Sequence, residues 1–260
     1  MTTPHPELDS FAKAMVEARV DGEQSMRPMP EPAITIDDAK AFQSAVFAHY
    51  GSPRVGWKVG ATNAAAQAGF GLDGPFYGPI VEAVVMRSGS DLKKTPCVGA
   101  VEPEYAFKLK RAYPAPGEEV SLETLKDAVD TVHIAIEVIG RALGHQDFAN
   151  GIGVTMDFGG NVAFVVGPEV ADWPHQDLVG TAVTAMVDGE TVGTGNGEPV
   201  MGDPINSVLW LAQNLAAVGQ QIEAGEWIST GTCTAPVPGE AGKTVSARFG
   251  TFGEVSVNFV

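Results

Sequence analysis

Hydrophobic positions recur with helical spacing near the start of the chain. Residues 8–20 and 36–50 place apolar side chains three or four positions apart, which predicts two helices. Thr35 precedes the second helix and Asp38 lies three residues on, as in a capping box. Between the helices, the proline-rich segment 26–34 predicts an extended linker. The beginning of the chain is therefore predicted to be helical.

The remainder of the chain is dominated by short alternating or wholly apolar runs bounded by Gly, Pro and Asp, which predict strands. These runs are "VGWKVGAT", "VEPEYAFKL", "HIAIEVI" and "NVAFVVG". Two hairpins are also predicted, with turns at Asp188-Gly189 and at residues 250–253. Because strands outnumber helices and do not alternate with them regularly, we expect an α+β fold on a mixed or antiparallel sheet. We expect a helical layer over residues 1–52 and a main domain over residues 53–260.

Two helices are predicted within the main domain. "SLETLKDAV" has Ser121 as its N-cap, and "DPINSVLWLAQNLAAVG" has Asp203 as cap, Pro204 in its first turn and Gly219 beyond its end. A side-chain oxygen at the cap accepts from the free N–H groups of the first turn, which fixes where each helix begins.

The composition narrows the possible classes of function. Apolar side chains make up 44% of the 260 residues, enough to bury a sizeable core. The formal net charge is −16 and no basic run occurs, so we expect neither nucleic acid nor a membrane as partner. Cys97 and Cys233 match no disulfide or zinc pattern and are predicted to be small buried residues. Without a secretory signal or a long apolar run, the sequence predicts a cytoplasmic protein.

Two acids stand one residue apart inside the predicted strand "GAVEPEYAFKL". Alternation puts Glu102 and Glu104 on one face, and it puts Glu137 of "HIAIEVI" opposite the apolar face of its own strand. Neighbouring buried carboxylates repel and are costly to desolvate, so they need a counter-charge. A hard divalent cation such as Mg²⁺ supplies one. A solvated face on two half-exposed strands is the alternative interpretation.

Lys58 has a comparable strand setting, between Gly56 and Gly60 in "RVGWKVGAT". Glycines beside a strand residue allow the backbone to approach a ligand closely, which predicts a binding site here. Most lysines are surface residues. Beside a metal, however, an ammonium group would bind a substrate carboxylate or stabilise an enolate oxygen.

Seven segments together resemble the fumarylacetoacetate hydrolase superfamily, specifically its 2-keto-4-pentenoate hydratase and 4-oxalocrotonate decarboxylase group. In order they are "GWKVGATN", "GPFYGPI", "VEPEYAFKL", "AIEVIGRAL", "GDPINSVLWLAQNLA", "ISTGTCTAPVP" and "FGTFGEVSVNFV". The resemblance runs from the N-terminal helices to the last residue. It implies a distorted mixed β-roll with peripheral helices and a homo-oligomer, often pentamer-based.

The same resemblance implies roles for individual residues. It makes Glu102, Glu104 and Glu137 the ligands of Mg²⁺ or Mn²⁺, and it makes Lys58 the catalytic lysine. The substrate-binding residues that it implies are Tyr77 of "GPFYG" and Thr230, Thr232 and Thr234 of "TGTCT".

Two departures from the group's pattern affect the predicted reaction. Phe76 stands where hydratases of the group usually carry an acid in "P-D-[FY]-G", and the nearest acid, Asp73, is offset by three residues. Of the common "D-x-x-x-D" run, "GVTMD" keeps Asp157 and has Gly153 in place of the first acid. An apolar residue at position 76 and a "VEPE" strand resemble the decarboxylases of the group.

The sequence therefore predicts a metal-dependent lyase for a small 2-oxo (2-hydroxydienoic) acid, in the catabolism of aromatic or related compounds. A 2-keto-4-pentenoate hydratase-like activity stands first, and a 4-oxalocrotonate-type decarboxylase is the alternative. An acylpyruvate C–C hydrolase ranks third, because it relies on a His/Glu pair and every histidine has an ordinary interpretation. The histidines are His5, His49, His133, His145 and His175. A non-catalytic binding paralogue is the remaining alternative.

Overall fold

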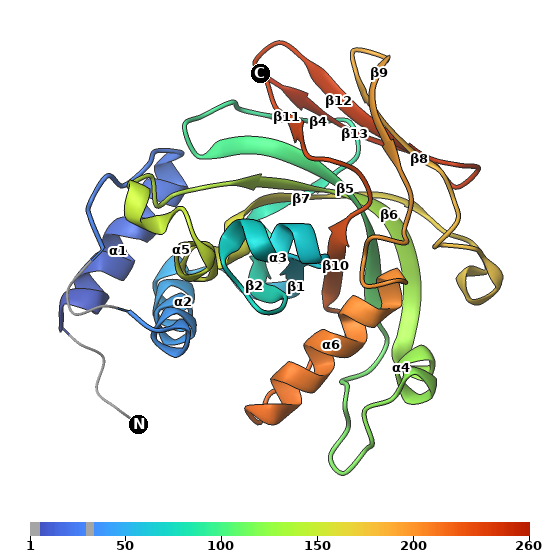
Figure 1. Cartoon of the computed structure of the whole chain (residues 1–260), viewed down its shortest axis with the longest axis horizontal. Helices are drawn as coiled ribbons and strands as arrows, with labels where there is room; N and C mark the ends of the chain where they lie inside the picture. The colour runs from blue at the N-terminus through green and yellow to red at the C-terminus, as the bar shows by residue number, and fades with distance from the viewer. Residues whose placement is uncertain (1–5, 30–33) are drawn as a thin grey trace.

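The computed structural model describes residues 6–29 and 34–260, which form two sheets with helices around them (Figure 1). The larger sheet contains β1 (Arg54–Gly60), β2 (Phe76–Val81), β3 (Val85–Arg87), β5 (Val98–Leu109), β6 (Val129–Gly140), β7 (Asn161–Glu169), β10 (Trp227–Thr232) and β11 (Val237–Pro238). The smaller sheet contains β4 (Ser90–Leu92), β8 (Val183–Val187), β9 (Glu190–Gly195), β12 (Thr244–Phe249) and β13 (Gly253–Phe259). The α-helices are α1 (Pro6–Asp21), α2 (Ile36–Tyr50), α3 (Ala64–Phe70), α4 (Leu122–Ala128), α5 (Gly151–Met156) and α6 (Pro204–Ala217).

Strand pairing makes the larger sheet mixed rather than purely antiparallel. Its order is β2-β1-β10-β5-β6-β7-β3, with β11 added beside β5. The β1–β10 and β3–β7 pairs are parallel and the other pairs are antiparallel. In Figure 1 the long strands β5 and β6 curve strongly, so that the sheet wraps around the helices at its centre. The predicted α+β fold with a distorted mixed sheet is confirmed.

Local sequence signals set the ends of the helices. Thr35 and Asp38 form the predicted capping box of α2, and Ser121 and Asp203 cap α4 and α6. Both predicted hairpins form, as β8–β9 and β12–β13. In the predicted linker, residues 30–33 lie outside the described residues. The predicted helix caps and hairpin turns are therefore confirmed in the described residues.

The N-terminal helices pack onto the main sheet through a shared apolar core. Phe11 of α1 contacts Phe42 of α2, with ring centroids 5.5 Å apart, and it stacks on Phe148 at 5.7 Å. Met156 of α5 belongs to the same buried cluster. The helices thus contact segments that follow β6 in the chain, and the predicted boundary at residue 53 stays a prediction.

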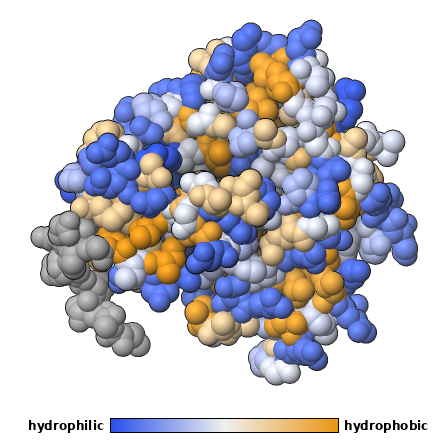
Figure 2. All heavy atoms as spheres, in the orientation of Figure 1, coloured by the Kyte–Doolittle hydropathy of each residue, from blue (hydrophilic) through white to orange (hydrophobic). Residues whose placement is uncertain are grey.

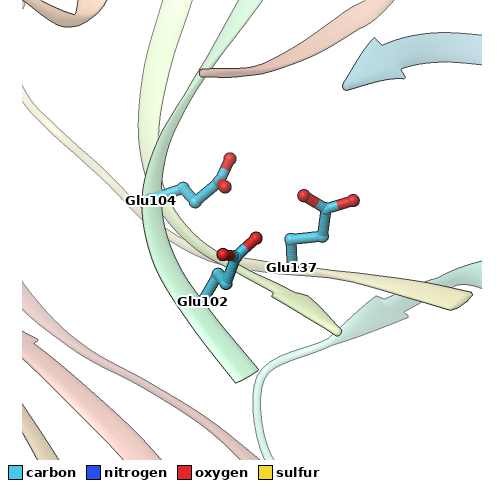
Figure 3. A group of neighbouring side chains, drawn as sticks. All are labelled: Glu102, Glu104 and Glu137. Atoms are coloured by element: carbon cyan, nitrogen blue, oxygen red, sulfur yellow. The ribbon is translucent and has the colours of Figure 1, made fainter. Parts of the chain in front are cut away.

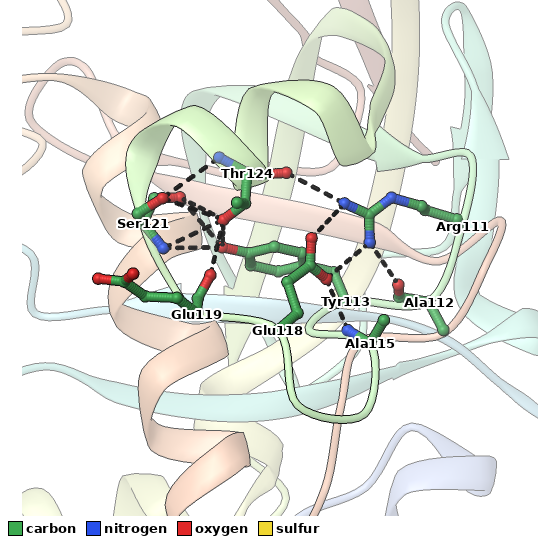
Figure 4. Close-up of polar contacts among 8 residues, drawn as sticks. All are labelled: Arg111, Ala112, Tyr113, Ala115, Glu118, Glu119, Ser121 and Thr124. Carbon is green, nitrogen blue, oxygen red and sulfur yellow. Dashed lines mark hydrogen bonds and ion pairs between the residues drawn. The ribbon is translucent and has the colours of Figure 1, made fainter.

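A polar network holds the connection from β5 to α4 (Figure 4). Arg111 donates two hydrogen bonds to the Glu118 carboxylate, 2.8 and 2.6 Å long. The hydroxyl of the buried Tyr113 donates to the Ser121 carbonyl oxygen at 3.0 Å and lies 2.9 Å from the Thr124 hydroxyl. Since this connection leads through α4 into β6, a fixed conformation here helps to set the register between β5 and β6.

The cysteines are buried as predicted, and the face of the molecule shown in Figure 2 is mixed in polarity. Hydrophilic and apolar side chains are interspersed over the face shown in Figure 2. Cys97 and Cys233 are buried and unpaired, as predicted. Among the described ranges, none of the helices combines the length and the hydrophobicity that crossing a bilayer requires.

Candidate active site

Pairing of β5 with β6 brings three glutamates together on the larger sheet. Glu102 lies directly opposite Glu137, and Glu104 lies opposite Ala135, so the three acids share one face. Figure 3 shows their side chains converging on a common space. One oxygen from each carboxylate lies within 4.8 Å of the others. The strand faces predicted from alternation are therefore observed.

Each buried glutamate has one oxygen bound by the protein and one left over. Glu104 Oε2 accepts from the Ser229 hydroxyl at 2.5 Å and from the Gly231 N–H at 2.9 Å. Glu137 Oε1 accepts from the Asn161 side-chain amide at 2.9 Å. Among the described residues, neither of the second oxygens, Glu104 Oε1 and Glu137 Oε2, accepts a hydrogen bond although both are buried. Glu137 Oε2 has the Lys58 ammonium as an ion-pair partner, whereas Glu104 Oε1 has no partner. A buried oxygen without a partner is rare, and here it fits a bound cation.

The buried Lys58 side chain lies beside this cluster. Its Nζ donates to the Gly159 carbonyl oxygen at 2.7 Å, lies 3.2 Å from Glu137 Oε2 and sits 5.0 Å from the centre of the Phe76 ring. Gly159 has a φ of 66°, and a Cβ there would lie 2.6 Å from Lys58 Cδ, so glycine is needed to admit the lysine. Three carboxylates against one ammonium leave two negative charges in excess, which a divalent cation would balance.

Burial and mutual repulsion act together on the carboxylates. Burial raises the pKa of Glu102 to about 7, and the negative charge of Glu137 adds to this effect. Burial, with the charges of Glu137 and Glu102, raises the pKa of Glu104 well above its usual range. For Lys58, burial alone would lower the pKa, but the three neighbouring carboxylates offset it and the pKa is raised. Extra positive charge at this place would therefore stabilise the ionised acids.

The glycines that flank Lys58 also allow tight packing within the protein. A Cβ at Gly60 would lie 2.4 Å from the Phe76 ring, and a Cβ at Gly56 would lie 2.4 Å from the Trp227 carbonyl oxygen. Gly60 also lies in the wall of the cavity beside the glutamates, so the close approach of a ligand there stays a prediction, whereas Gly56 does not line this cavity. The glycines let β1 pack tightly beside β10 and beneath Phe76.

A cavity of about 500 Å³ opens beside the glutamates. Lys58, Glu102 and Thr232 line it together with residues of α3 and α5. Phe76 and Phe148 contribute aromatic rings, and most of the remaining wall is aliphatic or glycine. A mostly apolar cavity with a few convergent polar groups is the usual form of a small-molecule site.

Of the three predicted threonines, only Thr232 lines this cavity. Thr230 is buried elsewhere, with its hydroxyl donating to the Tyr105 carbonyl oxygen at 2.9 Å, and Thr234 does not reach the cavity either. The cause is a β-bulge, because residues 230 and 231 together oppose Tyr105. Gly231 adopts a φ of 112° there, which a residue with a side chain rarely adopts.

Tyr77 does not line the cavity, in contrast to its neighbour Phe76. The Tyr77 ring instead packs edge-on against Trp57, at 5.6 Å between centroids, and against Trp210 at 6.1 Å. Successive residues of a strand point to opposite faces, so β2 presents Phe76 to the cavity and Tyr77 to α6. Phe76 was the better candidate for a substrate contact.

A buried network ties α1 to the glutamates. Arg19 forms an ion pair with Asp157, and it donates to the Asn161 carbonyl oxygen. Asp157 also accepts from the N–H groups of Ala142 and Leu143, at 2.6 and 2.9 Å, just after β6. Through the Asn161 side chain the network reaches the candidate metal ligands. Sequence reasoning noticed Asp157 but missed Arg19 and Asn161, whose contacts bridge distant parts of the chain.

Arg19→Met is expected to lower the free energy of unfolding by about 3 kcal/mol, because it leaves the Asp157 carboxylate buried without its partner. Both side chains are almost fully buried, 6% and 2% exposed. Arg248→Met is the matched control, since the Arg248–Glu254 pair is 61% and 42% exposed and should contribute less than about 1 kcal/mol. Urea unfolding measures both. Equal losses in the two variants would contradict a stabilising role for the buried pair.

Comparisons with known proteins agree with this geometry. A family model described as fumarylacetoacetate hydrolase C-terminal matches residues 82–260. The chain is 29% identical to 2-oxo-hept-4-ene-1,7-dioate hydratase of Escherichia coli, over 97% of this chain and 100% of that protein. It is 31% identical to 4-oxalocrotonate decarboxylase of Pseudomonas sp. (strain CF600), over 81% of this chain and 79% of that protein. The solved structure of 4-oxalocrotonate decarboxylase from Pseudomonas putida G7, complexed with magnesium and adipate, matches with a TM-score of 0.84 and 28% identity, covering 96% of this chain and 98% of that chain.

Proposed function

Because the chain belongs to the fumarylacetoacetate hydrolase family, we propose that it is a divalent-metal-dependent lyase that acts on a 2-oxo acid. The observation that carries the proposal is the cluster of Glu102, Glu104 and Glu137 beside the buried Lys58, at a cavity of about 500 Å³. Buried charges generally stabilise a fold less than apolar residues of the same size would. A purely structural or binding role gives no reason to keep four of them together.

The three glutamates are the residues that would hold the cation. Carboxylate oxygens suit hard divalent ions, and we propose Mg²⁺, with Mn²⁺ as the alternative. The similar decarboxylase structure from Pseudomonas putida G7 contains magnesium, which supports this choice. A divalent ion bound here would polarise a keto oxygen as a Lewis acid, an effect typically worth several kcal/mol.

Lys58 would donate hydrogen bonds to negative charge that develops on the substrate oxygens. Burial acts to lower its pKa, but the neighbouring carboxylates outweigh this effect and raise the pKa, which suits a hydrogen-bond donor rather than a base. The Gly159 carbonyl and Glu137 hold its Nζ in place, so little entropy is lost in orienting the ammonium group during the reaction.

Hydration, with water adding across a carbon–carbon double bond of a 2-hydroxydienoic acid, is the first candidate reaction. The full-length similarity to the Escherichia coli hydratase supports it. Decarboxylation is the second candidate, and Phe76 favours it, because an apolar ring lines the cavity where hydratases of this group usually carry a proton-handling acid. Hydrolysis of a C–C bond finds no support, since no histidine of the described residues lines the cavity; His5 lies outside them.

We expect purified protein with Mg²⁺ to turn over 2-hydroxypentadienoate by adding water, and to lose this activity when EDTA removes the metal. Dienoate absorbance measures water addition, and CO₂ release from 4-oxalocrotonate is measured in parallel. Release of CO₂ without any water addition would reverse the order of the two candidates. Absence of both reactions, together with a melting temperature that Mg²⁺ does not change, would exclude the lyase proposal.

A further inference from the structure

Arg141 lines the cavity without an anionic partner among residues 6–29 and 34–260. It directly follows β6, the strand that carries Glu137. Its Nε donates to the Leu143 carbonyl oxygen at 3.2 Å, and its Nη2 donates to the Leu143 and His145 carbonyl oxygens at 3.0 and 3.1 Å. These bonds fix the guanidinium group. Nη1 of Arg141 takes part in none of these hydrogen bonds. It is also not one of the buried side-chain atoms that lack a partner, so it is accessible and available to a ligand.

Of the other charged groups in the described cavity wall, Lys58 and Asp157 each have an ion-pair partner. Lys58 pairs with Glu137 at 3.2 Å, and Asp157 pairs with Arg19. The remaining carboxylate belongs to the glutamate cluster. Arg141 is therefore the one cationic group of this wall, within the described chain, that still lacks a counter-charge. A guanidinium in mostly apolar surroundings is stabilised when an anion reaches it.

Arg141 and the glutamates are separated by a distance that a short carbon chain can bridge. Arg141 is the fourth residue after Glu137 along the chain, which corresponds to about 13 Å of extended backbone at ~3.3 Å per residue. The wall of the same cavity includes the apolar side chains of Ile139, Leu143 and Phe148. The carbon chain of a 2-oxo acid bound at the glutamates would lie against this apolar wall, and its far end would approach Arg141.

We propose that Arg141 binds a second carboxylate, so that the substrate is a 2-oxo dicarboxylic acid. The inference rests on the proposed function, which places the 2-oxo acid end at the glutamates. Guanidinium and carboxylate groups match in shape and form charge-assisted hydrogen bonds. The pairing stabilises the carboxylate as an anion and thus opposes its departure as CO₂. It therefore favours hydration, in which both carboxylates remain on the product.

Kinetics of the Mg²⁺-loaded protein on two substrates tests the role of Arg141. The substrates are 2-hydroxyhepta-2,4-diene-1,7-dioate, with two carboxylates, and 2-hydroxypentadienoate, with one. Arg141→Gln is expected to lower kcat/KM for the dicarboxylate about 10- to 100-fold, through KM, and to change it for the monocarboxylate less than about 3-fold. Arg141→Lys should recover part of the loss, since it keeps the charge without the planar fork. Arg248→Gln, at an exposed ion pair, should change neither value.

Thermal shifts with saturated analogues give a second readout that does not require turnover. With Mg²⁺ present, 2-oxoadipate should raise the melting temperature of the wild type more than 2-oxohexanoate does, and Arg141→Gln should abolish the difference. Equal losses on both substrates, or equal shifts by both analogues in the wild type, would overturn the inference. Should the wild type turn over neither substrate while the Arg141-dependent shift persists, the proposed reaction fails and the ligand class stands.

Discussion

Glu104→Gln is expected to remove the stabilisation of the protein by Mg²⁺ and to lower turnover on the order of 10³-fold. The amide oxygen can still accept from Ser229 and Gly231, as Glu104 Oε2 does now. Its NH₂ group then occupies the place of the unpartnered Oε1, where an N–H donor cannot bind a cation. The substitution thus keeps the shape of the side chain and removes one ligand together with one negative charge.

Thermal unfolding with and without Mg²⁺ measures the first effect, and dienoate turnover measures the second. For the wild type, a metal concentration of 100 times Kd should add about 2.7 kcal/mol to the free energy of unfolding. Without metal, Glu104→Gln should be at least as stable as the wild type, because it relieves repulsion among buried carboxylates. Glu240→Gln, at an exposed glutamate, is the control and should leave the Mg²⁺ response unchanged. A wild type that does not respond to divalent metals would contradict the assigned metal site.

The metal-ligand candidates could be predicted from the sequence because strand alternation decides which face a side chain occupies. Glu102 and Glu104 share a face in any strand of regular geometry, whatever its partner is. Their approach to Glu137 could not be predicted from alternation. It depends on the register of β5 against β6, and the connection through Arg111 and Tyr113 contributes to that register.

The predicted substrate contacts came from motif resemblance, which does not tell which face of a strand each residue occupies, and only Thr232 of them lines the cavity. The bulge at Gly231 shifts the alternation, so that Ser229 reaches Glu104 while Thr230 points elsewhere. The dipeptide Phe76-Tyr77 can present only one of its rings to the cavity, and the sequence does not show which. Gly231 inside β10 is the sequence signal that could have indicated the bulge, and its φ of 112° in the structure agrees with one.

Contacts between segments that are distant along the chain could not be predicted from the sequence. The sequence of α1 is that of an ordinary amphipathic helix. Its Arg19 is nevertheless buried against Asp157, which lies far from it in the sequence. Asn161 is the first residue of β7, and its side-chain amide donates a hydrogen bond to Glu137. Nothing in its local sequence distinguishes it from a turn residue. Such pairs form only when the tertiary fold brings α1 and the start of β7 beside the end of β6.

Lys58→Met is expected to lower kcat about 10²- to 10³-fold while the protein still binds Mg²⁺. Methionine keeps much of the apolar stem that packs near Phe76 and Gly159, and it removes the ammonium group. Loss of this positive charge beside Glu137 leaves the carboxylates more attractive to a cation, so the affinity for Mg²⁺ should be unchanged or higher. Lys243→Met, at an exposed ion pair with Asp188, is the matched control and should keep full activity.

The opposite signs of the two effects separate a catalytic lysine from one that only supports the fold. A lysine needed for folding would, on substitution, weaken Mg²⁺ binding and lower the melting temperature together with activity. A lysine that stabilises charge in the transition state would lower kcat alone, because the glutamates still converge on β5 and β6 without it. Isothermal titration with Mg²⁺ and steady-state kinetics on the same preparation distinguish these cases. If Lys58→Met keeps an activity within about 3-fold of the wild type, the ammonium group does not stabilise the transition state, and the role assigned to Lys58 is wrong.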